Sequence, residues 1–287
     1  MKSPSDPSHV CGVAAEIATE AGAMIAAAFR QTMRVEHKLD AHDPVTEHDR
    51  LIEAHIRTRL LEAVPGSSFL GEESGSTDAE GRWRWIVDPI DGTANFAAGM
   101  PYVCCSIGVA RDRRMVGGIV NAPLLEEHFE AWPGHFVFID RRGRHTRADP
   151  GPSRESEALA TGYFPFRTCP ENHRQALMRD VAELSQVFAA LRTPGACALD
   201  LAHTACGHVG VSMATWVKPW DVAAGIYLVE AAGGTVTTWD RGTGLPHGLR
   251  PAFVAQAPSL AHTRAVEVFD AATKTWLHDA NVVDDPR

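Results

Sequence analysis

The chain has 287 residues, of which 45% are hydrophobic and 22% charged, and its formal net charge is −9. This length and balance are typical of a globular protein that buries a sizeable core in one large or two modest domains. The negative charge argues against a protein that binds nucleic acid through a basic surface.

The cysteines and the N-terminal segment indicate the compartment. None of the cysteines forms a CxxC pair or a ladder of regular spacing, which predicts reduced thiols in a cytosolic protein. The first residues, MKSPSDPSH, lack the apolar core of a signal peptide, and we find no apolar run of the ~20 residues that a membrane span needs. We therefore expect a cytoplasmic protein with no membrane partner. The six cysteines are Cys11, Cys104, Cys105, Cys169, Cys197 and Cys206.

The first third of the chain predicts two helices and a short strand. Apolar residues recur at helical spacing over 10–29 and again over 47–64. Thr46 is a candidate N-cap of the second helix, and Asp49 stands three residues later, in the place of a capping-box acid. This structural role explains Asp49 about as well as a functional role does. A short strand at 68–70 follows and leads into a loop that contains two glutamates.

The middle of the chain predicts a β-sheet that ends in a boundary. Segment 140–157 is polar and rich in proline, glycine and arginine, so we expect it to separate a first subdomain, 1–145, from a second, 146–287. The strands expected before this boundary cover 102–110, 115–121, 129–132 and 136–139, and residues 111–114 form a hairpin turn.

The second half alternates strands with helices, which favours an α/β fold with layered elements. The expected strands are 159–162, 209–216, 235–239 and 253–257, and the expected helices are 173–190, 195–208, 218–232 and 260–277.

The stretch WIVDPIDGTANF at 85–96 is the feature around which the chain is organised. An apolar β-prone run delivers Asp88 and Asp91, and two desolvated carboxylates repel each other strongly unless a cation lies between them. Gly92 and Thr93 then open a short helix, where free backbone N–H groups suit an anion. Cation ligands beside an anion cradle predict a metal-assisted phosphate site.

Four acidic residues, Glu72, Asp88, Asp91 and Asp221, each fall where a strand or loop meets a helix. Taken alone, Glu72 fits a solvated loop and Asp221 fits a helix N-cap. Taken together, they fit a hard cation such as Mg²⁺, which prefers oxygen ligands and keeps several waters. Four carboxylates could hold two or three ions, and two ions can stabilise both the entering and the leaving oxygen of a displacement at phosphorus.

Several motifs resemble those of the inositol monophosphatase family of magnesium-dependent, lithium-sensitive phosphatases. The similarity extends over nearly the whole chain, and the DPIDGT and WD motifs in this order are specific. The matching segments are DPVTEHD at 43–49, GEES at 71–74, WIVDPIDGTANF at 85–96, LATG at 159–162, GACALDLA at 195–202 and KPWDVAAG at 218–225, and Lys38 stands where the family has an upstream lysine.

The resemblance implies a set of metal ligands. Glu72, Asp88 and the backbone carbonyl of Ile90 would hold a first Mg²⁺. Asp88, Asp91 and Asp221 would hold a second, and Glu72 with water a weaker third. Mn²⁺ is a possible substitute for Mg²⁺.

The resemblance also implies the remaining roles. Thr93 and Asp49, together with Glu72, would serve catalysis by orienting the metal-bound water that attacks phosphorus. The backbone N–H groups of Gly92 and Thr93 would bind the phosphate. It further implies a layered αβαβα sandwich of the sugar-phosphatase type and a homodimer. The full set of expected substrate-binding residues is Lys38, Asp91, Gly92, Thr93, Cys197 and Ala214.

The chain departs from the family on the substrate side. Ala214 stands seven residues before Asp221, where the family has an acid that accepts hydrogen bonds from substrate hydroxyls. Gly210 stands near a second missing acid, while Cys197 and Trp216 alter the expected pocket. A hydroxyl that loses its buried acceptor costs about 1–3 kcal/mol. We therefore expect weak discrimination in favour of myo-inositol 1-phosphate.

These observations predict the Mg²⁺-dependent hydrolysis of a small phosphate monoester of an inositol, a sugar or a related polyol. The alternatives within the same chemistry are histidinol-phosphate, fructose-1,6-bisphosphate and 3′-phosphoadenosine 5′-phosphate. A non-catalytic metal- or phosphate-binding regulator is the alternative from another class, and it is disfavoured because every expected metal ligand is present.

Overall fold

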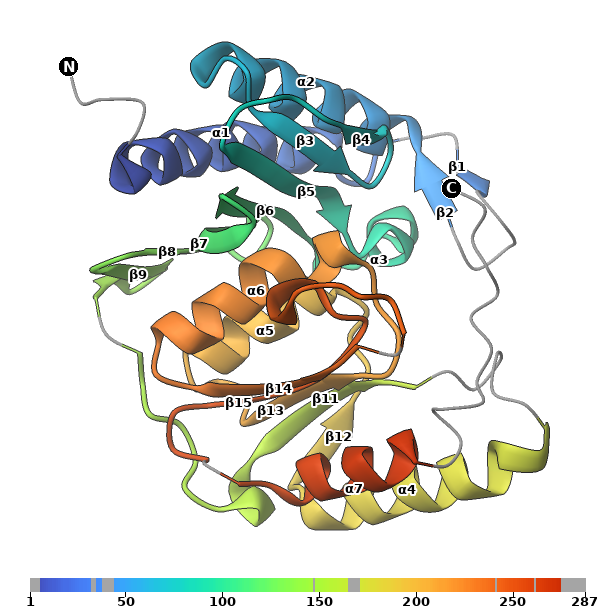
Figure 1. Ribbon diagram of the computed structural model, residues 1–287. Helices are drawn as coiled ribbons and strands as arrows, with labels where there is room; N and C mark the ends of the chain where they lie inside the picture. The colour runs from blue at the N-terminus through green and yellow to red at the C-terminus, as the bar shows by residue number, and fades with distance from the viewer. Residues whose placement is uncertain are drawn as a thin grey trace.

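The fold consists of five alternating layers of helix and sheet, as Figure 1 shows. The computed structural model describes residues 6–31, 35–37, 44–146, 148–164, 171–240, 242–260 and 262–274. This arrangement confirms the expected α/β fold with αβαβα layers. In order, the layers are α1 (Pro7–Ala28) with α2 (Glu47–Ala63), an eight-stranded sheet, α5 (Cys197–Ala205) with α6 (Pro219–Ala231), a five-stranded sheet, and α4 (Arg174–Val187) with α7 (Arg264–Thr273).

The larger sheet is antiparallel except where β3 and β5 run parallel. It places the ends of β3 and β5 next to each other at one edge, so the loops that follow them start from neighbouring positions. The strands in spatial order are β10 (Gly143–His145), β9 (His135–Asp140), β8 (Glu127–Trp132), β7 (Arg114–Ala122), β6 (Cys104–Arg111), β5 (Trp83–Asp91), β3 (Ser68–Gly71) and β4 (Gly75–Thr77).

The smaller sheet is mixed. β11 runs parallel to β12 and β13, whereas β15 is antiparallel to β13 and β14. In spatial order the strands are β12 (Ala190–Arg192), β11 (Leu159–Tyr163), β13 (Val211–Ala214), β15 (Ala252–Gln256) and β14 (Thr235–Trp239). A separate two-stranded ribbon joins β1 (Val35–His37) to β2 (Pro44–Thr46), directly before α2.

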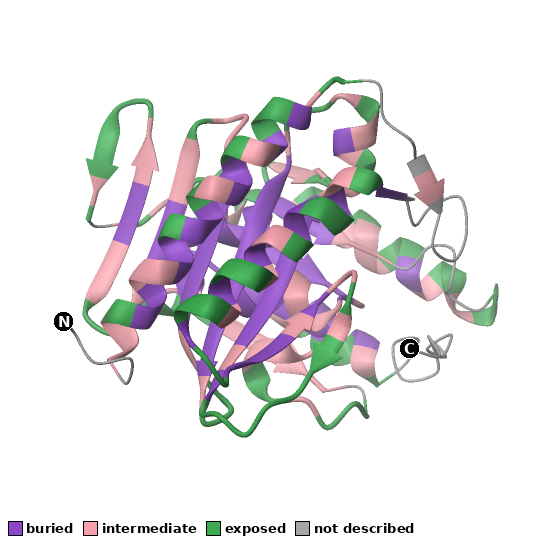
Figure 2. Ribbon diagram, turned by 90° about the horizontal axis from the view of Figure 1, so that it is seen from above, coloured by how far each residue is buried: buried purple, intermediate pink, exposed green. Residues whose placement is uncertain are grey.

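Small residues let α6 approach the larger sheet closely, and this approach fixes where α6 begins. A Cβ atom at Gly118 of β7 would lie 2.3 Å from the Ala224 carbonyl oxygen, and one at Gly108 of β6 would lie 2.7 Å from the Ala223 Cβ. Figure 2, viewed from the opposite side of the sheet, shows its central strands buried beneath α1 and α2, whose outer faces are exposed. The N-terminus of α6, which carries Asp221, is therefore held by close packing.

Helix α1 corrects one expectation drawn from the sequence. Its 22 residues are long and apolar enough to span a membrane by length and composition, although we expected no such run. Within the most apolar window, 44% of residues are buried inside the fold. The buried side includes Ile17, Ala21 and Ile25, which belong to the core cluster between α1, α2 and the larger sheet. The alanines that raise its mean hydropathy serve this close packing.

The segment 140–157 is less irregular than expected. It contains β10, which pairs with β9, and a 3-10 turn at Glu155–Glu157. The polar composition of this segment predicted a linker because β10 is a short edge strand, and its residues lie largely in solvent. The short strand β12, which follows α4, was not expected either. The division of the chain at 145/146 stays a prediction.

Five cysteines lie among the described residues, and all are buried free thiols, as expected. Cys169 lies outside the described residues. Burial raises the pKa of the Cys105 thiol to about 12, so this side chain stays protonated and unreactive at neutral pH.

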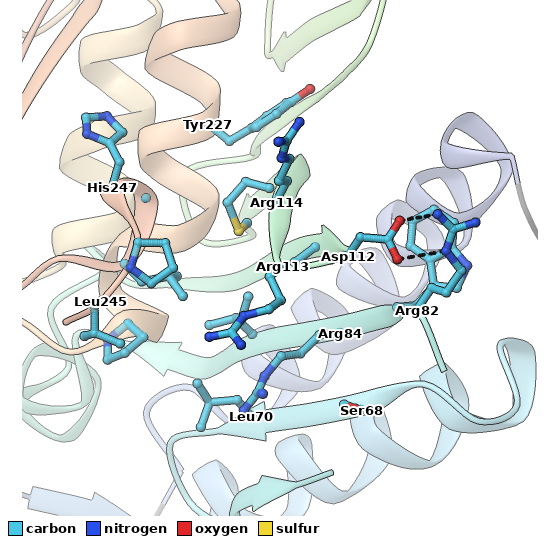
Figure 3. Close-up of a pocket in the computed structure, with 18 of the residues that line it drawn as sticks. Ser68, Leu70, Arg82, Arg84, Asp112, Arg113, Arg114, Tyr227, Leu245 and His247 are labelled. Carbon is cyan, nitrogen blue, oxygen red and sulfur yellow. Dashed lines mark hydrogen bonds and ion pairs between the residues drawn. The ribbon is translucent and has the colours of Figure 1, made fainter. Parts of the chain in front are cut away.

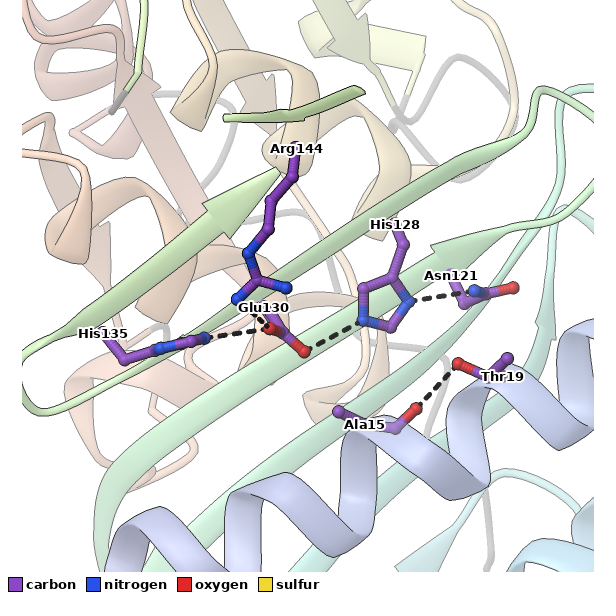
Figure 4. A network of polar contacts seen from close by, with 7 residues as sticks. All are labelled: Ala15, Thr19, Asn121, His128, Glu130, His135 and Arg144. Carbon is purple, nitrogen blue, oxygen red and sulfur yellow. Dashed lines mark hydrogen bonds and ion pairs between the residues drawn. The ribbon is translucent and has the colours of Figure 1, made fainter. Parts of the chain in front are cut away.

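A buried carboxylate ties together β8, β9 and β10. Glu130 accepts hydrogen bonds from His128 Nε2 at 3.2 Å and from His135 Nε2 at 2.9 Å, and Arg144 lies 3.7 Å away (Figure 4). Asn121 Nδ2 lies 2.9 Å from His128 Nδ1, which leaves the His128 Nε2–H free to donate to Glu130. Burial raises the pKa of Glu130, but the hydrogen bonds from the two histidines outweigh it and lower the pKa overall.

This lowered pKa predicts a pH-dependent contribution to stability. A carboxylate whose pKa is lower in the folded state stabilises the fold above its unfolded pKa and loses that contribution as pH falls through the folded value. We expect Glu130→Gln to lower the free energy of unfolding by about 1–2 kcal/mol at neutral pH. The deficit should shrink below about pH 4. Urea denaturation across this range measures it, and the exposed Glu126→Gln serves as the matched control. A deficit that is independent of pH would contradict the prediction.

Candidate active site

The two aspartates of β5 reach the same face of the sheet because the strand is irregular between them. Residues three apart in a regular strand point to opposite faces. Here Asp88 pairs with Ser106 and Asp91 with Cys104, so three steps along β5 match two steps along β6. This is a β-bulge at Pro89, which has no N–H to donate to the ladder. The bulge brings both carboxylates into one buried electrostatic cluster.

The turn after Asp88 is fixed by local hydrogen bonds. The Ile90 N–H donates to Asp88 Oδ1 at 3.0 Å. The Thr93 hydroxyl lies 3.0 Å from the Ile90 carbonyl oxygen and 3.0 Å from Asp49 Oδ1, and it can donate its one hydrogen to either. Gly92 lies between them with φ 91°, and a Cβ there would lie 3.0 Å from the Tyr102 carbonyl oxygen, so this position requires glycine.

Asp49 has the structural role that the sequence predicted, and its functional role stays a prediction. It is the capping-box acid of α2, since its Oδ2 accepts from the Thr46 N–H at 2.8 Å and from the Thr46 hydroxyl at 2.5 Å. Its other oxygen faces Thr93, as described above. Asp49 is completely buried, so the same contacts that cap the helix also orient its second oxygen toward α3 (Thr93–Ala98).

Glu72 follows β3 and lies beside Asp88. Its N–H donates to the Val87 carbonyl oxygen at 3.2 Å, and its carboxyl shares a hydrogen bond with Asp88. The loop is held from α2 by Glu53, which accepts the N–H groups of Glu73 at 2.8 Å and Ser74 at 2.7 Å. Sequence reasoning missed Glu53. A charged residue on the apolar face of the expected helix 47–64 was the available signal.

Asp221 is close to its expected place but not in its expected cap position. The N-cap of α6 is Lys218, and Asp221 is the third helical residue, whose Oδ2 accepts from the Lys218 N–H at 2.7 Å. Proline at the first helical position shifts the start of the helix to before Trp220. Asp221 contributes to raising the pKa of both Asp88 and Asp91, so its carboxylate faces them.

Asp91 joins the two halves of the chain. Its carboxylate accepts the N–H groups of Cys197 at 3.1 Å and Ala198 at 2.7 Å, at the N-terminus of α5. The Cys104 thiol is 3.6 Å from Asp91 Oδ2. These donors favour the ionised carboxylate, as does the positive end of the helix. Sequence reasoning placed Cys197 in the substrate pocket, whereas its backbone here holds Asp91 and its side chain is 6% exposed.

The carboxylates are electrostatically incompatible without a cation. Burial, followed by the charges of Glu72, Asp91 and Asp221, raises the pKa of Asp88 well above its usual range. Burial and Asp221 likewise raise the pKa of Asp91, and the two N–H groups from α5 only partly oppose this. Carboxylates held this close gain from a divalent ion, which favours their charged forms.

The donor set fits a hard cation that keeps part of its water. Among the described residues, no group of three or more Asp, Glu, His or Cys side chains is placed closely enough to hold a metal ion as it stands. Mg²⁺ does not need such a group, because it binds through one or two carboxylates and retains several waters. Asp88, Asp91, Asp221 and Glu72 supply oxygen only, which fits Mg²⁺ and does not suit a zinc site.

A further buried carboxylate near Asp91, Asp200 on α5, was not identified from the sequence. It accepts the Tyr102 hydroxyl at 2.5 Å and the Tyr163 hydroxyl at 2.7 Å. Burial raises the pKa of Asp200 to about 6, although both tyrosines lower it. The Tyr163 oxygen also accepts the Gly195 N–H at 2.9 Å, which fixes the loop before α5. One aspartate in an apolar helix was the signal that could have found it.

One expected substrate residue, Ala214, presents no exposed surface to this geometry. It ends β13 in the core. Lys38 lies outside the described residues.

Comparisons with known proteins agree with the geometry. The family model described as the inositol monophosphatase family matches residues 6–274. "Inositol monophosphatase 2" of Solanum lycopersicum is 34% identical over 230 residues, covering 78% of this chain and 85% of the relative. "Nus factor SuhB" of Pseudomonas aeruginosa is 34% identical over 232 residues, covering 78% and 83%. The crystal structure of the extragenic suppressor protein suhB from Bartonella henselae matches with TM-score 0.77 and 28% identity, covering 93% of this chain and 99% of that one.

The raised pKa values predict how Mg²⁺ affects stability. Because Asp88 and Asp91 bind protons more tightly in the folded state, their contribution is present below about pH 4 and is lost as pH rises through the folded pKa values. A Mg²⁺ ion bound by these carboxylates would take over the role of those protons at higher pH. We expect the increase in Tm caused by Mg²⁺, relative to chelator, to be larger near pH 8 than near pH 5.

The matched control for this experiment is Asp88→Asn, which removes one charge and keeps an acceptor for the Ile90 N–H. In chelator near pH 8 it should melt above the wild-type protein, and it should respond less to Mg²⁺. Equal Mg²⁺ effects at both pH values would show that these carboxylates do not bind the ion.

Proposed function

The chain belongs to the inositol monophosphatase family, and on this premise we propose which of its residues carry out the Mg²⁺-dependent hydrolysis of a small phosphate monoester. Family membership makes the chain a phosphoric monoester hydrolase. The observation that supports the residue assignment is the burial of Asp88 and Asp91 against Glu72 and Asp221, which raise the pKa values of the two aspartates.

We assign Asp88 to the centre of the metal site. With Glu72 and the Ile90 carbonyl it would hold one Mg²⁺, and with Asp91 and Asp221 a second; a third, held by Glu72 and water, is also part of the proposal. The hydrogen bond between Glu72 and Asp88 supports the first group, because it shows that the two carboxyls already meet. When bound, the ions lower the pKa of water and offset the negative charge of the phosphate and leaving group.

Thr93 and Asp49 would position the attacking water. When the Thr93 hydroxyl donates to Asp49 Oδ1, its oxygen lone pairs are left to accept a hydrogen bond from that water. Asp49 is held in place from its other side by the Thr46 N–H and hydroxyl. This arrangement orients the water and provides a path by which its proton reaches a carboxylate.

The phosphate would bind at the start of α3. The first N–H groups of a helix have no partner within the helix, and those of Gly92 and Thr93 begin α3 directly beside Asp91. A left-handed backbone at Gly92 turns the chain sharply between the carboxylate and the helix. The phosphate oxygens and the metal ligands would then occupy neighbouring positions.

The residues on the substrate side support a broad preference among phosphate esters rather than a strict preference for one. Ala214 presents only a buried methyl group where the family has an acid, and Asp200 cannot replace that acid because it is 1% exposed and covered by two tyrosines. Cys197 is buried and offers little polar surface. Polyol hydroxyls would therefore find fewer acceptors than in relatives that keep the acid.

The remaining parts of the proposal rest on the family and on composition. They are a homodimer, a cytoplasmic location, sensitivity to Li⁺ and replacement of Mg²⁺ by Mn²⁺. The net charge of −9 supports the absence of a nucleic-acid partner.

Asp221→Asn tests the metal assignment cleanly. The amide oxygen can still accept the Lys218 N–H and cap α6, so we expect the fold and Tm to be retained. Loss of the charge should reduce Mg²⁺-dependent phosphate release at least about a hundredfold. The matched control is Asp140→Asn, a carboxylate in the β9–β10 turn that should keep full activity. Full activity in Asp221→Asn would reject the assignment.

A substrate panel tests the altered substrate side. We expect kcat/KM for myo-inositol 1-phosphate to lie within about tenfold of that for simpler polyol phosphates such as glycerol 2-phosphate, because one lost acceptor removes about 1–3 kcal/mol of discrimination. The panel also includes histidinol-phosphate, fructose-1,6-bisphosphate and 3′-phosphoadenosine 5′-phosphate. A preference of more than about a hundredfold for the inositol ester would contradict the expectation. No turnover of any ester would favour the non-catalytic regulator.

A further inference from the structure

A cavity of about 870 Å³ lies beside the active site rather than over it. It is enclosed by β3, β5, the β6–β7 hairpin, α6 and the segment 245–249, as Figure 3 shows. Its volume is that of a small-molecule site. The apolar part of its lining comes mainly from Leu70, Ile86, Met115, Tyr227 and Leu249. The metal-site carboxylates are not among the residues that line it.

The lining carries four arginines and four carboxylates, so its total charge is balanced, and its unpaired positive charge lies at the β6–β7 hairpin. Arg82 is paired with Asp112, Arg84 with Asp78, and His247 with Glu230. Arg113 and Arg114 have no carboxylate partner within the described part of the chain, and Glu80 is the one further acid in the lining. Figure 3 shows the side chains of Arg84 and Arg113 directed toward the space between Leu70 and Leu245.

The backbone at Arg113 is strained, and the fold offers no structural reason for an arginine there. Asp112 and Arg113 form the two-residue turn between β6 and β7 with φ values of 51° and 65°. Such turns favour asparagine and glycine, because other residues are strained at positive φ. Asp112 has a structural role, since it binds Arg82 through its side chain and its N–H donates to the Arg82 carbonyl at 2.9 Å. Strain kept without such a role is typical of functional sites.

We propose that this cavity binds a small amphiphilic anion. The apolar body of the ligand lies on Leu70, Met115 and Leu249, and Arg113 binds its carboxylate, sulfonate or phosphate group. Both the apolar surface and the positive charge of the cavity come mainly from rigid elements, namely β3, β5, the β6–β7 hairpin and α6. The proposal does not depend on the hydrolytic function, because no proposed metal ligand lines the cavity, although Leu70, Ile86 and Pro219 each stand two residues before one.

The test compares two fluorescent probes of similar shape. 1-Anilinonaphthalene-8-sulfonate has an apolar body and one negative charge, and N-phenyl-1-naphthylamine is its neutral counterpart. Arg113→Gly removes the cation and also relieves the positive-φ strain, so the variant should be at least as stable as the wild-type protein. Arg113→Lys keeps both the charge and the strain and is the matched control. Arg113→Asn, which also tolerates a left-handed backbone, is a second variant without the charge.

We expect Arg113→Gly and Arg113→Asn to lower the affinity for the anionic probe about five- to tenfold and to leave the affinity for the neutral probe unchanged. Arg113→Lys should bind both probes about as the wild-type protein does. Unchanged affinity for the anionic probe in both variants would overturn the proposal. An equal loss for both probes would overturn it as well, because the cause would then be the shape of the cavity. Asp221→Asn should bind the anionic probe as wild type does, and this separates the result from that of the hydrolytic assignment.

Discussion

The structure depends on a conflict between burial and charge on β5. Asp88 and Asp91 would point to opposite faces of a regular strand, and the bulge at Pro89 turns both into one low-dielectric cluster. Burying two ionised carboxylates together costs free energy, and the N–H groups of the surrounding elements offset only part of this cost. The site is therefore poised for a divalent cation, and the position of every neighbouring element can be related to that requirement.

The N-termini of three helices donate backbone N–H groups to acidic residues of this site. Asp49 caps α2 and faces Thr93, Asp221 caps α6, and Asp91 accepts the first N–H groups of α5. Each contact serves local structure and also places an oxygen at the site, so capping and function cannot be separated by mutation to alanine. The positive ends of helices favour carboxylates. The pKa values of Asp88 and Asp91 remain raised despite these contacts, so the helices alone do not neutralise the cluster.

The sequence predicted those parts of the molecule that are set by local rules. The amphipathic helices, the long strands and the capping box at Asp49 follow from spacing and residue type. The bulge does not, because one proline and two aspartates are equally compatible with a plain strand end. Glu53 and Asp200 were missed for a related reason: their roles depend on partners that are distant in sequence, such as the Ser74 N–H and the Tyr102 hydroxyl. The short strands β10 and β12 carry too few residues to show a periodicity.

Helix α6 contributes residues to both of the proposed sites. Close packing of Ala223 and Ala224 against Gly108 and Gly118 makes the helix rigid, so its N-terminus cannot shift without moving the helix across the sheet. Pro219 forms part of the wall of the adjacent cavity, and Asp221 faces the carboxylates of β5. A ligand in the cavity alters the metal site only if it binds two positions of this helix with different affinity. The tight glycine contacts disfavour a second position, and binding that leaves hydrolysis unchanged is the outcome that this packing supports.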